Sequence, residues 1–216
     1  MFDLDFPTLI SRIFILIIAF SVHEFSHAKV ADMFGDNTPR ANGRLTLNPL
    51  RHLDPFGSIM LLVAGFGWAR PVPVNPYALG RAAPSAMMWV SLAGPMSNFL
   101  LAIFGAVVLR AGILPATLGG AESLLPTPQG FMLEFVWINL ALMLFNLIPL
   151  APLDGEKIAA YFAPPSIARV LETISPYGPV ILLALVFIGP RFGLNFFGII
   201  IGEPLRNLFY LLVGGF

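Results

Sequence analysis

The sequence contains no cysteine and few charged residues. Only 11% of its 216 residues are charged, with 12 basic and 12 acidic side chains and a formal net charge of zero. Without thiols the chain forms no disulfide and offers no thiolate to a metal, so a metal site must use histidine or carboxylate ligands. The balanced charge supplies no excess of basic residues, and we expect no nucleic-acid partner. Average soluble domains have about 25% charged residues, so this composition is not that of an ordinary soluble protein.

Apolar residues dominate instead and make up 57% of the chain. A helix needs about 20 residues to cross the hydrocarbon core of a bilayer. Runs close to this length cover residues 9–33, 86–109, 131–150 and 177–190. A fifth run, 194–216, has two apolar halves around Glu203, Pro204 and Arg206, which predicts a kinked span or two half-inserted segments. We therefore expect an all-α polytopic membrane protein with about five transmembrane helices, forming a single domain over residues 1–216.

One apolar stretch, residues 57–68, is too short to span a bilayer as a helix. It leads into residues 70–76, where prolines alternate with other residues. Alternating proline favours extended backbone, and a sheet at membrane depth is tolerated only where it packs on protein or lines a cavity. The pattern predicts a small membrane-associated β hairpin, with a re-entrant segment as the alternative.

The basic residues are unevenly distributed among the loops. Loop 111–130 has none and is only bordered by Arg110, whereas loops 29–85 and 151–175 carry Lys29, Arg40, Arg44, Arg51, Arg70, Arg81, Lys157 and Arg169. Because Lys and Arg favour cytoplasmic loops, this asymmetry predicts an N-terminus outside and a C-terminus inside. We expect a multi-pass protein of the cell (inner) membrane, in contact with the lipid bilayer.

Three ionisable residues lie inside the first apolar run, in the segment His23-Glu24-Phe25-Ser26-His27. An ionisable side chain at the bilayer centre costs about 2.5 to 3.5 kcal/mol on insertion scales, which favours a functional role. On a helix, His23 and His27 project from one face and can share a metal ion, with Glu24 beside it as a base. This is the pattern of a zinc hydrolase, here nearer the cytoplasmic end of its span.

A hydrolytic zinc needs a third protein ligand, and the candidate is Asp154. It follows the span 131–150, which runs in the same direction as the first span. Pro149 and Pro152 break the helix there, and Gly155 permits a tight turn or a close backbone approach. The alternatives for Asp154 are a helix-end residue or an ion-pair partner for Lys157.

Together these motifs resemble the site-2 proteases, which are intramembrane zinc metalloproteases. The resemblance rests on HExxH in the first span, on NxxPxxxLDG from Asn146 to Gly155, and on GPxxN from Gly94 to Asn98. Residues 43–50 and 67–76 further resemble the compact prokaryotic branch that lacks PDZ and CBS domains. One departure is Gly155-Glu156-Lys157, where the family pattern has Gly-Gly-Arg; it affects the local loop rather than the ligand.

The resemblance implies a three-helix catalytic core in which His23, His27 and Asp154 bind one Zn²⁺ and Glu24 is the general base and acid. It also implies that Asn146 binds or polarises the scissile peptide. Asn98 is a second substrate-binding candidate, and for both amides the alternative is hydrogen bonding between helices. His52 is expected to be a loop hydrogen-bonder rather than a ligand.

We therefore expect an intramembrane zinc endopeptidase whose partner is a membrane protein with a transmembrane helix. Glu24 would deprotonate a zinc-activated water for attack on the peptide. The substrate helix must unwind, and residues 65–75 are expected to receive it as an added strand. Two alternatives are a membrane metal-ion transporter and a proteolytically inactive scaffold of the same fold.

Overall fold

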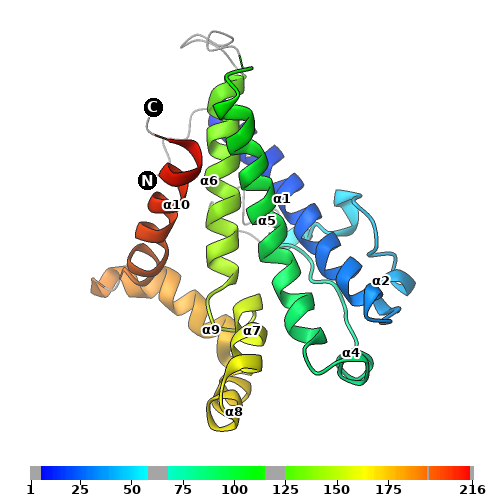
Figure 1. Ribbon diagram of the computed structural model, residues 1–216. Coiled ribbons are helices and arrows are strands. Elements are labelled where there is room, and N and C mark those ends of the chain that lie inside the picture. Colours follow the sequence, from blue (N-terminus) through cyan, green and yellow to red (C-terminus); the bar gives the residue numbers. More distant parts are fainter. Residues whose placement is uncertain (1–5, 58–67, 115–124, 194, 215–216) are drawn as a thin grey trace.

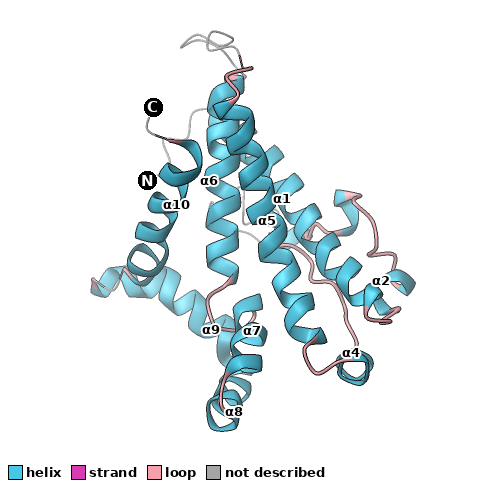
Figure 2. Cartoon of the chain, viewed as in Figure 1, coloured by secondary structure: helices cyan, strands magenta, loops and turns pink. Residues whose placement is uncertain are grey.

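The protein is described by a computed structural model over residues 6–57, 68–114, 125–193 and 195–214, and these residues are mainly helical (Figures 1 and 2). Three long helices dominate: α1 (Phe6–Met33), α5 (Ala86–Arg110) and α6 (Pro128–Asn146). The shorter helical elements are α2 (Thr38–Ala41), η1 (Pro49–Arg51), α4 (Pro76–Ala82), α7 (Asp154–Phe162), α8 (Pro165–Ile174), η2 (Ser175–Tyr177), α9 (Gly178–Leu183), η3 (Ala184–Ile188), η4 (Gly189–Phe192), η5 (Gly198–Gly202) and α10 (Glu203–Val213).

The ends of the long helices carry ordinary stop and start signals. Helix α1 is followed by Gly35 at φ 84°, in the left-handed region that glycine adopts without strain. Helix α6 begins at Pro128, and the Thr127 side chain caps it by accepting the N–H of Gly130 at 3.0 Å. The loops therefore begin and end where local chemistry favours them.

The bundle is built around α5, which packs against both α1 and α6 (Figure 1). Small residues make this close packing possible. Ala102 and Ala106 of α5 are buried with Val136 and Leu140 of α6, and a Cβ added at Gly105 would lie 2.8 Å from Val136. Helices α1 and α6 also contact each other, with Arg12 Nε 3.3 Å from Glu134 Oε1, and their C-terminal ends lie towards the same end of the bundle (Figure 1).

The long helices have apolar outer surfaces and polar groups inside. Phe14 of α1 is 57% exposed and Leu100 of α5 is 61% exposed, whereas Ser11 and Ser21 of α1 are buried. Such large exposed apolar side chains are stable against lipid rather than water. Four helical runs are long and apolar enough to cross a membrane: 6–33, 86–110, 128–146 and 165–192. The chain is a multi-pass membrane protein.

The predicted fifth span, residues 194–216, is not among the four runs found in the described residues, and the predicted side of the C-terminal region needs correction. The helical run continues from residue 196 through η5 and α10 to residue 213, about 27 Å at 1.5 Å per residue. Arg110 Nη2 donates to the carbonyl of Leu211 at 2.8 Å, so α10 ends beside the end of α5 and not at the opposite end. The cause is the preceding run, α9–η3–η4, which lies across the lower end of α6 in Figure 1.

The predicted β hairpin is also not found among the described residues, and residues 58–67, on which most of it falls, lie outside them. The described flanks contain one isolated antiparallel bridge, between Leu53 and Ala69. The N–H of Arg70 donates to the carbonyl of His52 at 2.7 Å, and the next residues include Pro71 and Pro73. Proline has no N–H, so the ladder cannot continue in this direction.

Candidate metal centre

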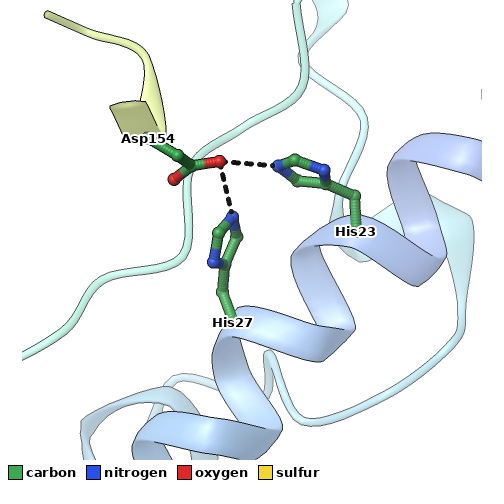
Figure 3. Close-up of side chains that lie close together, drawn as sticks. All are labelled: His23, His27 and Asp154. Carbon is green, nitrogen blue, oxygen red and sulfur yellow. Dashed lines mark ion pairs between the residues drawn. The ribbon is translucent and has the colours of Figure 1, made fainter. Parts of the chain in front are cut away.

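Two histidines of α1 and one aspartate of α7 converge in the interior. Figure 3 shows both imidazole rings projecting from one face of α1 towards Asp154. Asp154 Oδ2 lies 3.2 Å from His23 Nε2 and 3.3 Å from His27 Nε2. One possible ligand atom from each residue lies within 4.8 Å of the other two. The two histidines, four residues apart on α1, and the carboxylate that follows α6 therefore come together as the sequence predicts.

A close backbone approach places Asp154. Helix α6 ends at Asn146, residues 147–153 form an irregular loop, and Asp154 is the first residue of α7. A Cβ added at Gly155 would overlap the carbonyl oxygens of Leu147 and Ile148. Only glycine lets the loop fold back so tightly against the first turn of α7.

Helix α5 closes the other side of the cluster through Gly94. A Cβ at this position would overlap Nε2 of both His23 and His27. The helix backbone therefore comes directly against the two candidate ligand atoms, which explains why this position holds a glycine. Gly94 belongs to the GPxxN motif, and the motif alone does not indicate this role.

The second nitrogen of each histidine is already hydrogen-bonded. His27 Nδ1 lies 2.7 Å from the carbonyl oxygen of Val90, and His23 Nδ1 lies 2.6 Å from Asn98 Oδ1. Because both partners are acceptors, the Nδ1 atoms donate, and each Nε2 keeps its lone pair for a metal. Two imidazole nitrogens and a carboxylate are a donor set that suits zinc. Both histidines are buried, and Asp154 is partly buried.

Glu24 lies beside the cluster but is not part of it. Its side chain is buried, and Oε2 accepts the N–H of Val72 at 2.9 Å. Segment 70–75 therefore passes over the carboxylate that the sequence predicts to be the base.

A second carboxylate holds the far end of segment 70–75. Asp36 Oδ2 accepts the N–H of Asn75 at 2.6 Å, and Asp36 Oδ1 accepts the N–H of Thr38 at 2.9 Å. Burial alone would raise the pKa of Asp36, but the hydrogen bonds from Thr38 and Asn75 hold the pKa below its usual value. At the other end, Arg44 donates to the carbonyl of Arg70. The segment is thus held at three points.

The two amide candidates lie in different surroundings. Asn98 is fully buried; besides its contact with His23 Nδ1, its Nδ2 donates to Asn139 Oδ1 at 3.0 Å. Asn146 is partly buried at the last position of α6, and its Nδ2 donates to the carbonyl of Leu142 in its own helix at 3.0 Å. The structure therefore brings Asn98 against a metal-ligand candidate, and the substrate role of either amide stays a prediction.

One member of this polar group, Asn139, was not singled out from the sequence. It is fully buried on α6. Its position seven residues before Asn146 places both amides on one helix face, a spacing that could have identified it. His52, in contrast, behaves as expected: it is buried, and its Nε2 lies 2.6 Å from the carbonyl oxygen of Thr46.

Comparison with known proteins identifies relatives. The chain is 46% identical over 178 residues to "Putative zinc metalloprotease YwhC" of Bacillus subtilis, covering 81% of this chain and 78% of that protein. It is 30% identical over 205 residues to "Putative zinc metalloprotease Rip2" of Mycobacterium tuberculosis, covering 90% and 74%. It is also 30% identical to the Rip2 protein of Mycolicibacterium smegmatis, covering 81% and 67%. No family model matches the chain, and no solved structure matches it.

Proposed function

We propose, from the premise that this chain belongs to the zinc metalloprotease family of YwhC and Rip2, that it is an intramembrane endopeptidase of the site-2 protease type. The observation that carries the proposal is the position of the cluster. Three candidate zinc ligands lie within 4.8 Å of one another, two of them on a helix apolar enough to span a bilayer. Ligands at that depth serve a substrate that is itself in the membrane.

In this proposal His23, His27 and Asp154 hold the zinc. Their arrangement fits, because both histidines direct Nε2 at the carboxylate and have Nδ1 occupied. The chemistry that bound zinc supplies is a water whose pKa falls towards about 7 and a polarised substrate carbonyl. His23, Glu24 and His27 are buried, and electrostatic interactions between groups shielded from bulk water are stronger.

Glu24 moves the protons. Its carboxylate takes a proton from the attacking water and later gives it to the nitrogen of the leaving amine, so that one group serves both steps. The N–H of Val72 orients the carboxylate by binding Oε2. A base with a fixed direction is pre-organised for transfer, because its rotamer is chosen before the substrate arrives.

The substrate class we propose is a membrane protein cleaved within its transmembrane segment, with the active site nearer the cytoplasmic side of the cell membrane. A helical substrate must unwind, since its hydrogen-bonded backbone is closed to attack. The described part of segment 65–75 is irregular and lies over Glu24, which supports a role in receiving the unwound chain. Glu24 and Asp36 already bind the N–H groups of Val72 and Asn75, so pairing as an added strand would rely on the carbonyl groups of this segment. Asn146 remains our candidate for binding the scissile peptide.

The test is to map the cleavage position. The purified protein would be reconstituted in liposomes with a single-span test protein, and the fragments would be identified by mass spectrometry. We expect cleavage inside the hydrophobic segment, abolished by a zinc chelator and restored by added zinc. Cleavage confined to the segments outside the bilayer, or unaffected by the chelator, would contradict the proposal.

A further inference from the structure

A chain of hydrogen bonds connects the backbone of α6 to the metal-ligand candidate His23. Asn139 Nδ2 donates to the carbonyl of Phe135 at 2.9 Å, Asn98 Nδ2 donates to Asn139 Oδ1 at 3.0 Å, and His23 Nδ1 lies 2.6 Å from Asn98 Oδ1. Both amide side chains are fully buried. This chain of hydrogen bonds connects α6, α5 and α1 and ends at Nδ1 of the imidazole ring that faces Asp154.

The donor-to-acceptor direction of these hydrogen bonds is determined at the Phe135 carbonyl. A side-chain amide has a donor face and an acceptor face and can be turned either way, but a backbone carbonyl only accepts. The carbonyl of Phe135 can therefore bind only the NH₂ group of Asn139, and this orientation turns Asn139 Oδ1 towards Asn98. That oxygen in turn binds the NH₂ group of Asn98. The carbonyl of Ala19 also accepts from Asn98 Nδ2, but at 3.5 Å, so the 3.0 Å bond to Asn139 is the stronger of the two.

The same logic reaches the imidazole. With its NH₂ group directed at Asn139, Asn98 presents Oδ1 to His23, so Nδ1 must carry the proton and Nε2 must be bare. If Asn98 turned over, its NH₂ group would face Nδ1, and the proton of the neutral ring would move to Nε2, the atom nearest Asp154. Such a ring cannot bind a metal through Nε2.

The tautomer of His27 does not depend on an orienting side chain, since its Nδ1 partner is the backbone carbonyl of Val90, which cannot turn over. The two histidines thus differ in what determines their tautomer. We infer that Asn139 is a positioning residue for the metal centre, which sets the tautomer of His23 by holding the amide of Asn98 in one orientation. This inference rests on the proposed zinc site and goes beyond it by adding a residue that touches neither metal nor substrate.

The experiment measures zinc affinity in detergent by competition with a chromogenic chelator. Removing a group that orients a metal ligand costs about 10- to 100-fold in metal affinity, and we expect Asn139→Leu to weaken zinc binding by about this factor. Asn139→Ala, which is smaller and also lacks both polar atoms, is measured beside it and should show the same loss. Ser11→Ala is the control, because it removes another buried bond within a helix, from Ser11 Oγ to the carbonyl of Pro7.

A double variant distinguishes orientation from packing. In Asn98→Asp the carboxylate presents an oxygen to His23 whichever way it turns, so its orientation no longer depends on Asn139. We expect Asn98→Asp/Asn139→Leu to regain most of the affinity that Asn139→Leu loses. A double variant as weak as the single one, or single variants that bind zinc like the wild type, would overturn the inference.

The zinc site itself is checked in the same assay with His23→Ala. If this variant binds zinc as tightly as the wild type, the proposed zinc site fails. If His23→Ala loses zinc and the Asn139 variants do not, the site stands and only the role of Asn139 is wrong.

Discussion

At the scale of single residues, the candidate centre depends on two glycines as much as on its ligands. Gly155 lets the loop after α6 deliver Asp154, and Gly94 lets α5 lie against both Nε2 atoms. Neither glycine has a positive φ, so these positions need glycine because a Cβ would not fit, and not because of an unusual backbone conformation. Substitutions at these positions test how the ligands are brought together.

Asp154→Ala should lose both zinc and cleavage. Two histidines alone do not hold a hydrolytic zinc firmly, and the third donor comes from a part of the chain remote in sequence from α1. Elemental analysis of the purified variant measures this. Full zinc content in Asp154→Ala would remove this residue from the site.

Gly94→Ala should weaken zinc binding because the added methyl group overlaps the imidazole nitrogens. Overpacking costs about 1 to 3 kcal/mol, which corresponds to roughly a 5- to 150-fold loss of affinity if the histidines take up the displacement. Gly105→Ala is the matched control on the same helix, since its methyl group meets only side chains of α6 and leaves the histidines untouched. Equal zinc affinity in the two variants would show that Gly94 is not needed at the site.

The sequence could predict the ligands because their geometry is local or marked by helix breakers. His23 and His27 are one turn apart on a helix, and Asp154 lies two residues after Pro152. The spacing from Asn146 could have singled out Asn139 but not its role, because an amide in an apolar span also fits simple helix–helix bonding. Its role depends on which atoms of three helices meet, and only the packed structure shows that.

At the scale of elements, segment 70–75 differs most from expectation. Prolines and an adjacent apolar stretch predicted a hairpin, but the described residues show a single bridge followed by an irregular segment held by side chains. The pattern correctly indicated non-helical backbone. It could not indicate that Glu24 and Asp36 would take the N–H groups that a strand partner would otherwise use.

Val72→Pro should lower cleavage by about 10-fold while zinc content stays at the wild-type level. The substitution removes the N–H that binds Glu24, a hydrogen bond to a charged group worth about 1.5 to 3 kcal/mol. Val72→Ala keeps the N–H and should cleave a transmembrane test substrate almost as fast as the wild type. If both variants carry zinc and cleave equally fast, segment 70–75 has only a structural role and does not take part in cleavage.

At the scale of the whole molecule, composition and apolar runs predicted a helical multi-pass protein, and the structure confirms it. The number and course of the last spans were not predictable in the same way. The predicted span 177–190 falls within the candidate span 165–192, and its continuous helical run α9–η3–η4 lies across the lower end of α6 (Figure 1). Hydropathy reports preference for lipid, whereas the direction of a helix depends on what it packs against.

The proposed orientation predicts cysteine accessibility. Arg51→Cys should react with a membrane-impermeant reagent only after the cytoplasmic side is opened, whereas Ile113→Cys should react in intact cells, because the basic residues favour the cytoplasm. Both positions are exposed, while Arg44 in the same loop as Arg51 is buried and unsuitable. The reverse labelling pattern would invert the topology and place the centre nearer the outer face.

The central claim is that one zinc and one carboxylate base, brought together inside the membrane, cut a peptide bond. Glu24→Gln tests it most directly, because the side chain keeps its size and its contact with the Val72 N–H but can no longer accept a proton. The measurement is zinc content and cleavage of a transmembrane substrate on the same preparation. We predict wild-type zinc content with cleavage lowered by about 10²- to 10⁴-fold. A zinc-loaded Glu24→Gln protein that retains a tenth or more of wild-type cleavage would contradict the account.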